Sequence, residues 1–144
     1  MTSGNKSLAQ HQFAYLIPHA GRMILIDSVD SWTSQQIVCR TRTHLMHDNP
    51  LRLNGQLSAL HLIEYGAQST AIHGGLLTGQ AAPGFLAAVR GVHFYIDTLD
   101  EVTNDLVITA SAELKISNGA VYAIRIRDAD DTLLFDARTT VVNL

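Results

Sequence analysis

A single carboxylate stands out among the residues that could do chemistry, because the sequence around it is almost free of charge. Residues 53–89 contain one charged side chain, Glu64, although charged residues make up 16% of the chain. A segment so poor in charge is expected to be covered by the rest of the fold or by another chain, and burying an unpaired carboxylate is costly. Apolar surroundings should raise the pKa of Glu64, which would suit a general acid. The alternative is a core glutamate that is hydrogen-bonded to the backbone or to Gln68.

Two polar side chains lie within reach of Glu64 if this segment is helical. His61 precedes Glu64 by three residues and Gln68 follows it by four, which are spacings that share one face of a helix. His19 directly follows Pro18, ahead of an apolar segment, and from there it could face the mouth of a pocket. The histidines show no spacing typical of a zinc site, so we predict no metal.

Composition excludes several classes of function. A net charge of −3 offers no basic face for a phosphate backbone, so nucleic acid is not an expected partner. No apolar run approaches the roughly 18 residues that span a bilayer, and the first ten residues lack the apolar core of a signal peptide. Cys39 is the single cysteine, so no internal disulfide can form. We therefore expect a cytoplasmic protein with no membrane partner.

A long helix over Leu57–Leu77 is predicted to carry Glu64, since this segment is apolar and contains no proline. Before it, the pattern predicts a helical turn within residues 11–20, strands over Met23–Val29 and Gln35–Thr43, and a loop over residues 44–56. After it, apolar and polar residues alternate, which is typical of strands. The four strands expected there cover residues 85–96, 106–116, about 120–127 and 133 onward, with a hairpin turn at residues 117–119.

This order of elements predicts an α+β fold in which one antiparallel sheet wraps around one long helix. We expect a single domain over residues 1–144. Gly66 and Ala67 would keep part of the helix surface small, so that the sheet can approach it closely. Such a sheet leaves open edges, and pairing these edges across a two-fold axis predicts a dimer.

Several segments together resemble the hot-dog-fold β-hydroxyacyl-(acyl carrier protein) dehydratases. Residues 16–19, Leu-Ile-Pro-His, lead into an apolar run that ends in Asp27, and they look like the family's Leu-Pro-His motif. Residues 63–68, Ile-Glu-Tyr-Gly-Ala-Gln, resemble the Glu-x-x-Ala-Gln motif of its central helix. Residues 83–86, Pro-Gly-Phe-Leu, open the next strand as in the family. The segments at 48–51 and 71–75 are most similar to divergent members from aryl-polyene-type biosynthetic clusters.

The resemblance implies a hot-dog fold, a dimer with an acyl tunnel along the subunit interface, and removal of water from a 3-hydroxyacyl thioester. Glu64 matches the helix carboxyl that protonates the departing hydroxyl. Family members carry the catalytic base in a Gly-His-Phe-Pro segment, but Pro50 stands at the corresponding distance here. His19 is the first choice for the base. His44, His47 or a partner chain are the alternatives.

The leading hypothesis is therefore a hydro-lyase acting on 3-hydroxyacyl thioesters carried by acyl carrier protein, in fatty-acid or polyene-type biosynthesis, without a cofactor. Gln68, His61 and Gly84 are expected to bind the substrate. Two alternatives remain open: a non-catalytic subunit that completes the tunnel of an active homologue, and a hot-dog thioesterase. The expected assembly is a homodimer, or a heterodimer with a related hot-dog subunit.

Overall fold

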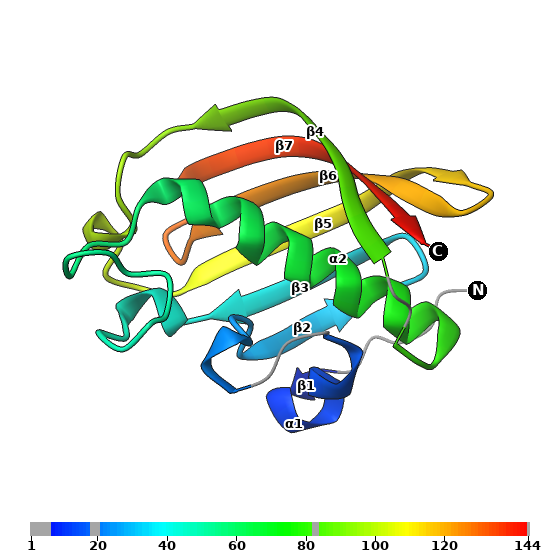
Figure 1. Ribbon diagram of the computed structural model, residues 1–144, viewed down its shortest axis with the longest axis horizontal. Helices are drawn as coiled ribbons and strands as arrows, with labels where there is room; N and C mark the ends of the chain where they lie inside the picture. Colours follow the sequence, from blue (N-terminus) through cyan, green and yellow to red (C-terminus); the bar gives the residue numbers. More distant parts are fainter. Residues whose placement is uncertain (1–6, 18–20, 82–83, 144) are drawn as a thin grey trace.

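The computed structural model of the chain describes residues 7–17, 21–81 and 84–143. It consists of one curved antiparallel sheet and one long helix, α2, which lies along the concave face of the sheet (Figure 1). The strands are β1 Leu8–Ala9, β2 Ser28–Trp32, β3 Gln36–Thr41, β4 Gly84–Phe94, β5 Leu106–Ile116, β6 Gly119–Asp128 and β7 Leu133–Asn143. The helices are α1 Gln10–Phe13 and α2 Leu62–Thr78, with 3₁₀ turns η1 Ala14–Leu16, η2 Gly21–Met23, η3 Thr43–Leu45, η4 Ala59–His61 and η5 Leu99–Glu101. This arrangement is the expected α+β hot-dog fold.

The sheet has seven strands in the order β1-β2-β3-β5-β6-β7-β4, and each pairing is antiparallel. The alternating segments after the helix form β4 to β7 as predicted, because the inner faces of β5, β6 and β7 pack against α2, while β4 extends the sheet beside β7. Gly91 has a φ of 58° and lies where the pairing of β4 with β7 shifts register. Strand β4 therefore bends there and passes over the end of α2 (Figure 1).

The prediction of a strand over Met23–Val29 is wrong, although its apolar residues do belong to the core. Ile24, Leu25 and Ile26 are buried, yet the strand begins only at Ser28. The backbone of Leu25 bonds to side chains instead of a neighbouring strand. Its N–H donates to Gln68, and its carbonyl accepts from the hydroxyls of Thr41 and Thr43. A short apolar run can be buried in this way without joining a sheet, and the sequence pattern does not separate the two cases.

The long helix starts five residues later than predicted, because the chain first makes the 3₁₀ turn η4. The Ser58 hydroxyl accepts from the Leu60 N–H ahead of this turn. At the other end, α2 runs through Gly74 and Gly75 and stops at Gly79, whose φ of 79° forms a left-handed cap. The glycine pair therefore lies inside the helix and does not loosen its end.

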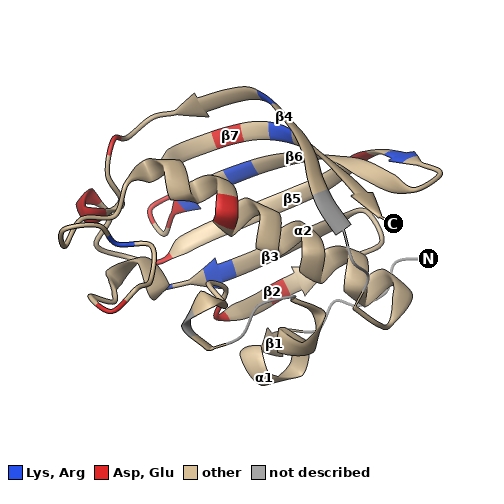
Figure 2. Ribbon diagram, in the orientation of Figure 1, with Lys and Arg blue, Asp and Glu red and all other residues tan. Residues whose placement is uncertain are grey.

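Two helix glycines allow α2 to touch its neighbours. A Cβ on Gly66 would lie 3.0 Å from the Ile124 side chain of β6, and one on Gly75 would lie 2.7 Å from Leu16. The expectation that Gly66 lets the sheet approach closely is confirmed. Glu64 is the single charged residue of α2, and Figure 2 shows how little charge the helix carries next to the loops and the outer face of the sheet.

Arg52 holds together the loop that leads from β3 to α2. Its guanidinium donates to the carbonyls of His44, Met46 and Gly55 and to the carboxylate of Asp100 at 2.6 Å. The Asp100 carboxylate also accepts from the Leu57 N–H.

Within the described part of the chain, no helix is both long and apolar enough to cross a membrane.

Replacing Gly119 with alanine is expected to destabilise the protein by about 3 kcal/mol, since the added methyl group would overpack a strand pair. The Cβ would stand 1.9 Å from the carbonyl oxygen of Val141, so β6 and β7 would have to separate locally. Chemical denaturation followed by circular dichroism measures the loss. Gly74→Ala is the matched control, because nothing lies within 4 Å of its Cβ position. Equal stability of the two variants would contradict the prediction.

Candidate functional site

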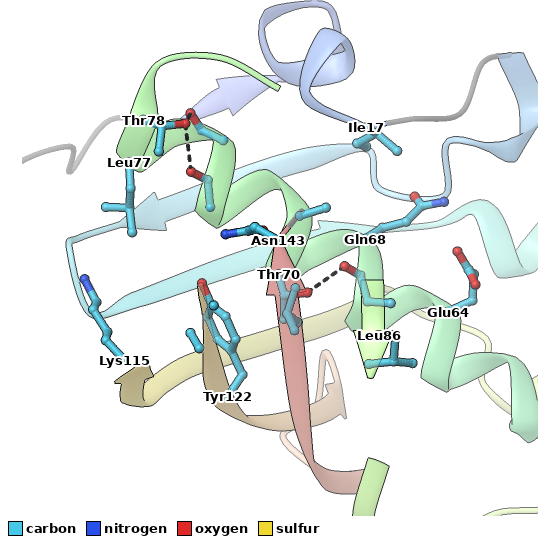
Figure 3. A pocket seen from close by; sticks show the side chains of 17 residues that line it. Ile17, Glu64, Gln68, Thr70, Leu77, Thr78, Leu86, Lys115, Tyr122 and Asn143 are labelled. Atoms are coloured by element: carbon cyan, nitrogen blue, oxygen red, sulfur yellow. Dashed lines mark hydrogen bonds between the residues drawn. The ribbon is translucent and has the colours of Figure 1, made fainter. Parts of the chain in front are cut away.

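A cavity of about 520 Å³ lies between α2 and the strands β4 to β7. It follows α2 from Glu64 to Thr78, a distance of about 20 Å at the rise of an α-helix. Most of its wall is apolar or small. The polar side chains on it are Glu64, Gln68, Thr70, Thr78, Lys115, Tyr122 and Asn143 (Figure 3). An elongated, largely apolar cavity with a few polar groups suits a ligand that is itself a long apolar chain.

Glu64 lies in the first turn of α2, at one end of this cavity. Among the described residues on the wall, it supplies the only carboxylate. The side chain is half-buried. Leu57 is buried ahead of the helix and Leu60 is 62% exposed, so neither lines the cavity with it. The wall beside Glu64 consists of Ala67, Gln68 and Ala71.

Gln68 is held at both ends by the chain's own backbone. Its Oε1 accepts from the Leu25 N–H at 2.8 Å, and its Nε2 donates to the Met23 carbonyl at 2.6 Å. The residue is 2% exposed and touches the cavity from the helix side. This amide therefore ties α2 to the segment before β2. A role in substrate binding stays a prediction.

Replacing Gln68 with leucine is expected to lower the free energy of unfolding by about 2 kcal/mol, because a buried N–H and a buried carbonyl would lose their partners. Urea denaturation measures this loss. The exposed Gln80 provides the control, since Gln80→Leu breaks no bond of this kind. If Gln68→Leu were as stable as Gln80→Leu, the two backbone bonds would not contribute to stability.

The structure brings none of the described histidines to the wall of the cavity. His61 lies at the junction of η4 and α2 and is partly exposed, and His47 is exposed on the loop. His44 is buried and donates from Nε2 to the Asn104 carbonyl, and burial lowers its pKa. His19 lies outside the described residues. In the described part of the chain, no cluster of three His, Cys, Asp or Glu side chains could hold a metal ion.

Gly84 is the first residue of β4 and pairs with Asn143 of β7, which lines the cavity. Three polar residues of the strands that the sequence did not single out also line the cavity: Lys115, Tyr122 and Asn143. Each comes from a strand packed beside the second half of α2. The alternation along β6 does place Tyr122 on the inward face with Ile124. This pattern could have predicted that Tyr122 faces the helix.

His73 is buried and hydrogen-bonds to Tyr122 of the cavity wall. Its Nδ1 lies 2.7 Å from the Tyr122 hydroxyl, and its Nε2 lies 2.8 Å from the carbonyl oxygen of Thr33. Burial lowers the pKa of His73 and raises the pKa of Tyr122 to about 12, so both side chains are neutral near pH 7. His73 lies nine residues after Glu64, on the opposite face of α2.

A family model for the ApeP-like dehydratases matches residues 11–144, which is nearly the whole chain. The chain belongs to the ApeP-like dehydratase family. This confirms the resemblance drawn from the motifs, and the family is one of dehydratase-type enzymes. No curated protein matches the chain.

Solved structures agree on the fold of this ApeP-like chain. The dehydratase heterocomplex ApeI:P from Xenorhabdus doucetiae has a chain that is 19% identical, with a TM-score of 0.78 over 92% of this chain and 90% of that chain. Zebra fish thioesterase superfamily member 2 is 14% identical, with a TM-score of 0.65 over 94% of both chains. The E. coli PaaI protein from the phenylacetic acid degradation operon is 14% identical, with a TM-score of 0.60 over 81% of this chain and 78% of that chain. At these identities, the likeness concerns the fold alone.

Proposed function

We propose that this chain takes part in removing water from 3-hydroxyacyl thioesters carried on acyl carrier protein. One observation carries the proposal: a glutamate in the first turn of the central helix opens onto a long apolar cavity. Membership of a dehydratase family supports the reaction type. The apolar wall suits the acyl chain, and the carboxyl group at one end suits the reacting carbons.

In the proposed reaction, a base takes the proton from the carbon next to the thioester carbonyl. The electron pair forms the new carbon–carbon double bond, and the bond to the 3-hydroxyl breaks. Glu64 gives its proton to the departing oxygen, so that water leaves with an enoyl thioester as the other product. The N-terminal end of α2 lies at the same end of the cavity as Glu64, and its partial positive charge would polarise the thioester carbonyl oxygen.

The identity of the base divides the proposal into two versions. Within the described wall of the cavity there is no histidine, and His19 remains the candidate within this chain. In the second version, a related hot-dog subunit supplies the base and this chain supplies Glu64 and the acyl cavity. A structural neighbour is a dehydratase heterocomplex, which favours the second version. Strand β4 is at an edge of the sheet and could pair with such a subunit.

The experiment is an assay of a 3-hydroxyacyl thioester on acyl carrier protein, with the enoyl product and free thiol measured separately. Enoyl product from this chain alone would support a base within the chain. Enoyl product only after a related hot-dog subunit is added would support the shared site. Free thiol without enoyl product would instead identify a thioesterase. One structural neighbour, zebra fish thioesterase superfamily member 2, carries that name.

A further inference from the structure

The pair His73 and Tyr122 has no part in the dehydration step, yet it reaches the cavity wall. Tyr122 is 4% exposed and rises from β6 with its oxygen towards α2 (Figure 3). Nine residues separate His73 from Glu64, which is about 13 Å along the helix axis. Tyr122 therefore lines the cavity far along α2 from Glu64 and from the reacting carbons.

The proton positions of this pair follow from its partners. A backbone carbonyl can only accept, so the His73 Nε2 must carry the proton that it donates to Thr33. A neutral imidazole then has only a lone pair at Nδ1, and the Tyr122 hydroxyl must donate to it over 2.7 Å. The single proton of Tyr122 is thus directed at His73. Towards the cavity, its oxygen can only accept.

The other hydroxyl groups on the described wall are oriented in the same way. Thr70 donates to the Ala67 carbonyl at 2.8 Å, and Thr78 donates to carbonyl groups near the end of α2, including that of Gln80 at 3.0 Å. Thr70 is 4% exposed and lies one helical turn before His73. The interior of the cavity therefore offers hydroxyl oxygens as acceptors, while the protons of these groups are already used inside the protein.

We propose that Tyr122 and Thr70 form an acceptor subsite for acyl chains that carry a hydroxyl group roughly 9 to 13 Å from the thioester end. The direction of the chain rests on the proposed function, which puts the thioester next to Glu64. A plain methylene chain leaves these buried oxygens without a donor, whereas a hydroxyl on the ligand can donate to them. His73 is a positioning residue, because it acts through the Tyr122 proton.

The test uses binding by the full chain, so that it does not depend on turnover. The probes are acyl-pantetheine amides, which cannot be hydrolysed or dehydrated, with decanoyl, dodecanoyl and tetradecanoyl chains. Each chain ends in a methyl, a hydroxyl or a methoxy group. Titration calorimetry compares the wild type with Tyr122→Phe, which removes only the oxygen. Tyr95→Phe is the matched control, since Tyr95 directly follows β4, is 53% exposed and bonds to Asp136 on the outer face.

For at least one chain length, we expect the hydroxyl probe to bind the wild type roughly threefold to tenfold more tightly than the methyl probe. The methoxy probe cannot donate to Tyr122 or Thr70, so any gain that it shows comes from donors such as Lys115 and should be unchanged in Tyr122→Phe. The preference should disappear in Tyr122→Phe and persist in Tyr95→Phe. His73→Leu should free the Tyr122 proton and raise the affinity of the methoxy probe. If a variant does not fold, the three probes on the wild type still decide the matter.

Equal binding of hydroxyl and methyl probes at every length would overturn the acceptor subsite, as would a preference that survives in Tyr122→Phe. These outcomes are independent of catalysis. A chain that discriminates between the probes but forms no enoyl product would retain the subsite and lose the proposed function. A chain that forms enoyl product without discriminating would do the reverse.

Discussion

Replacing Glu64 with glutamine is expected to lower the rate of enoyl thioester formation by at least about a hundredfold, the lower range for losing a general acid. Glutamine has nearly the same shape, so the cavity and the helix should be preserved. It has no acidic proton to give to the departing hydroxyl. The rate should fall whether the base comes from this chain or from a related subunit, because the acid is the same group in both versions.

Glu101→Gln is the control for this substitution. Glu101 is exposed in η5 and does not line the cavity, so the same chemical change there should leave the rate unaltered. The measurement is single-turnover formation of the enoyl thioester, in the assembly that shows activity. A Glu64→Gln variant that is folded and as fast as the Glu101→Gln variant would remove Glu64 from the chemistry. The dehydratase proposal would then lose the observation that carries it.

Replacing Arg52 with alanine is expected to destabilise the protein by about 3 kcal/mol, as much as Gly119→Ala. The Arg52 side chain is 12% exposed and donates to three backbone carbonyls and one carboxylate. Without it, the carbonyls of His44, Met46 and Gly55 lose a charged donor. These bonds join distant parts of the loop before α2, so its order should decrease together with the global stability.

A second measurement distinguishes the loss of the Arg52 hydrogen bonds from the loss of one positive charge. The Arg52 guanidinium holds the pKa of Asp100 below its usual value. The hydrogen bond from the Leu57 N–H lowers this pKa further, to a smaller extent. In Arg52→Ala, the pKa of Asp100 should rise towards its ordinary value, which NMR titration of the carboxyl group can measure. Arg90→Ala is the matched control, because Arg90 is exposed on β4. Equal losses of stability in the two variants would show that the clamp contributes little.

The sequence alone predicted the arrangement of helix and sheet, because both patterns are local. The period-two alternation identified β4 to β7, since apolar residues recur at every second position along much of each strand. The absence of charge over residues 53–89 identified the central helix and singled out Glu64. These features depend on which face of an element is buried, and this is written into neighbouring residues. The family motifs agreed with the same elements.

Contacts between distant segments were decided only by the tertiary structure. The buried backbone of Leu25 bonds to the side chains of Gln68, Thr41 and Thr43. An apolar run that looked like a strand is therefore not one. The ring nitrogens of His73 hydrogen-bond to Tyr122 and to Thr33, which lie 49 and 40 residues away along the chain. No local pattern encodes a hydrogen bond across such a separation, because the two partners are chosen by packing. The sequence therefore determined which residue could act as the acid, whereas the fold decided the shape and the polarity of the cavity in front of it.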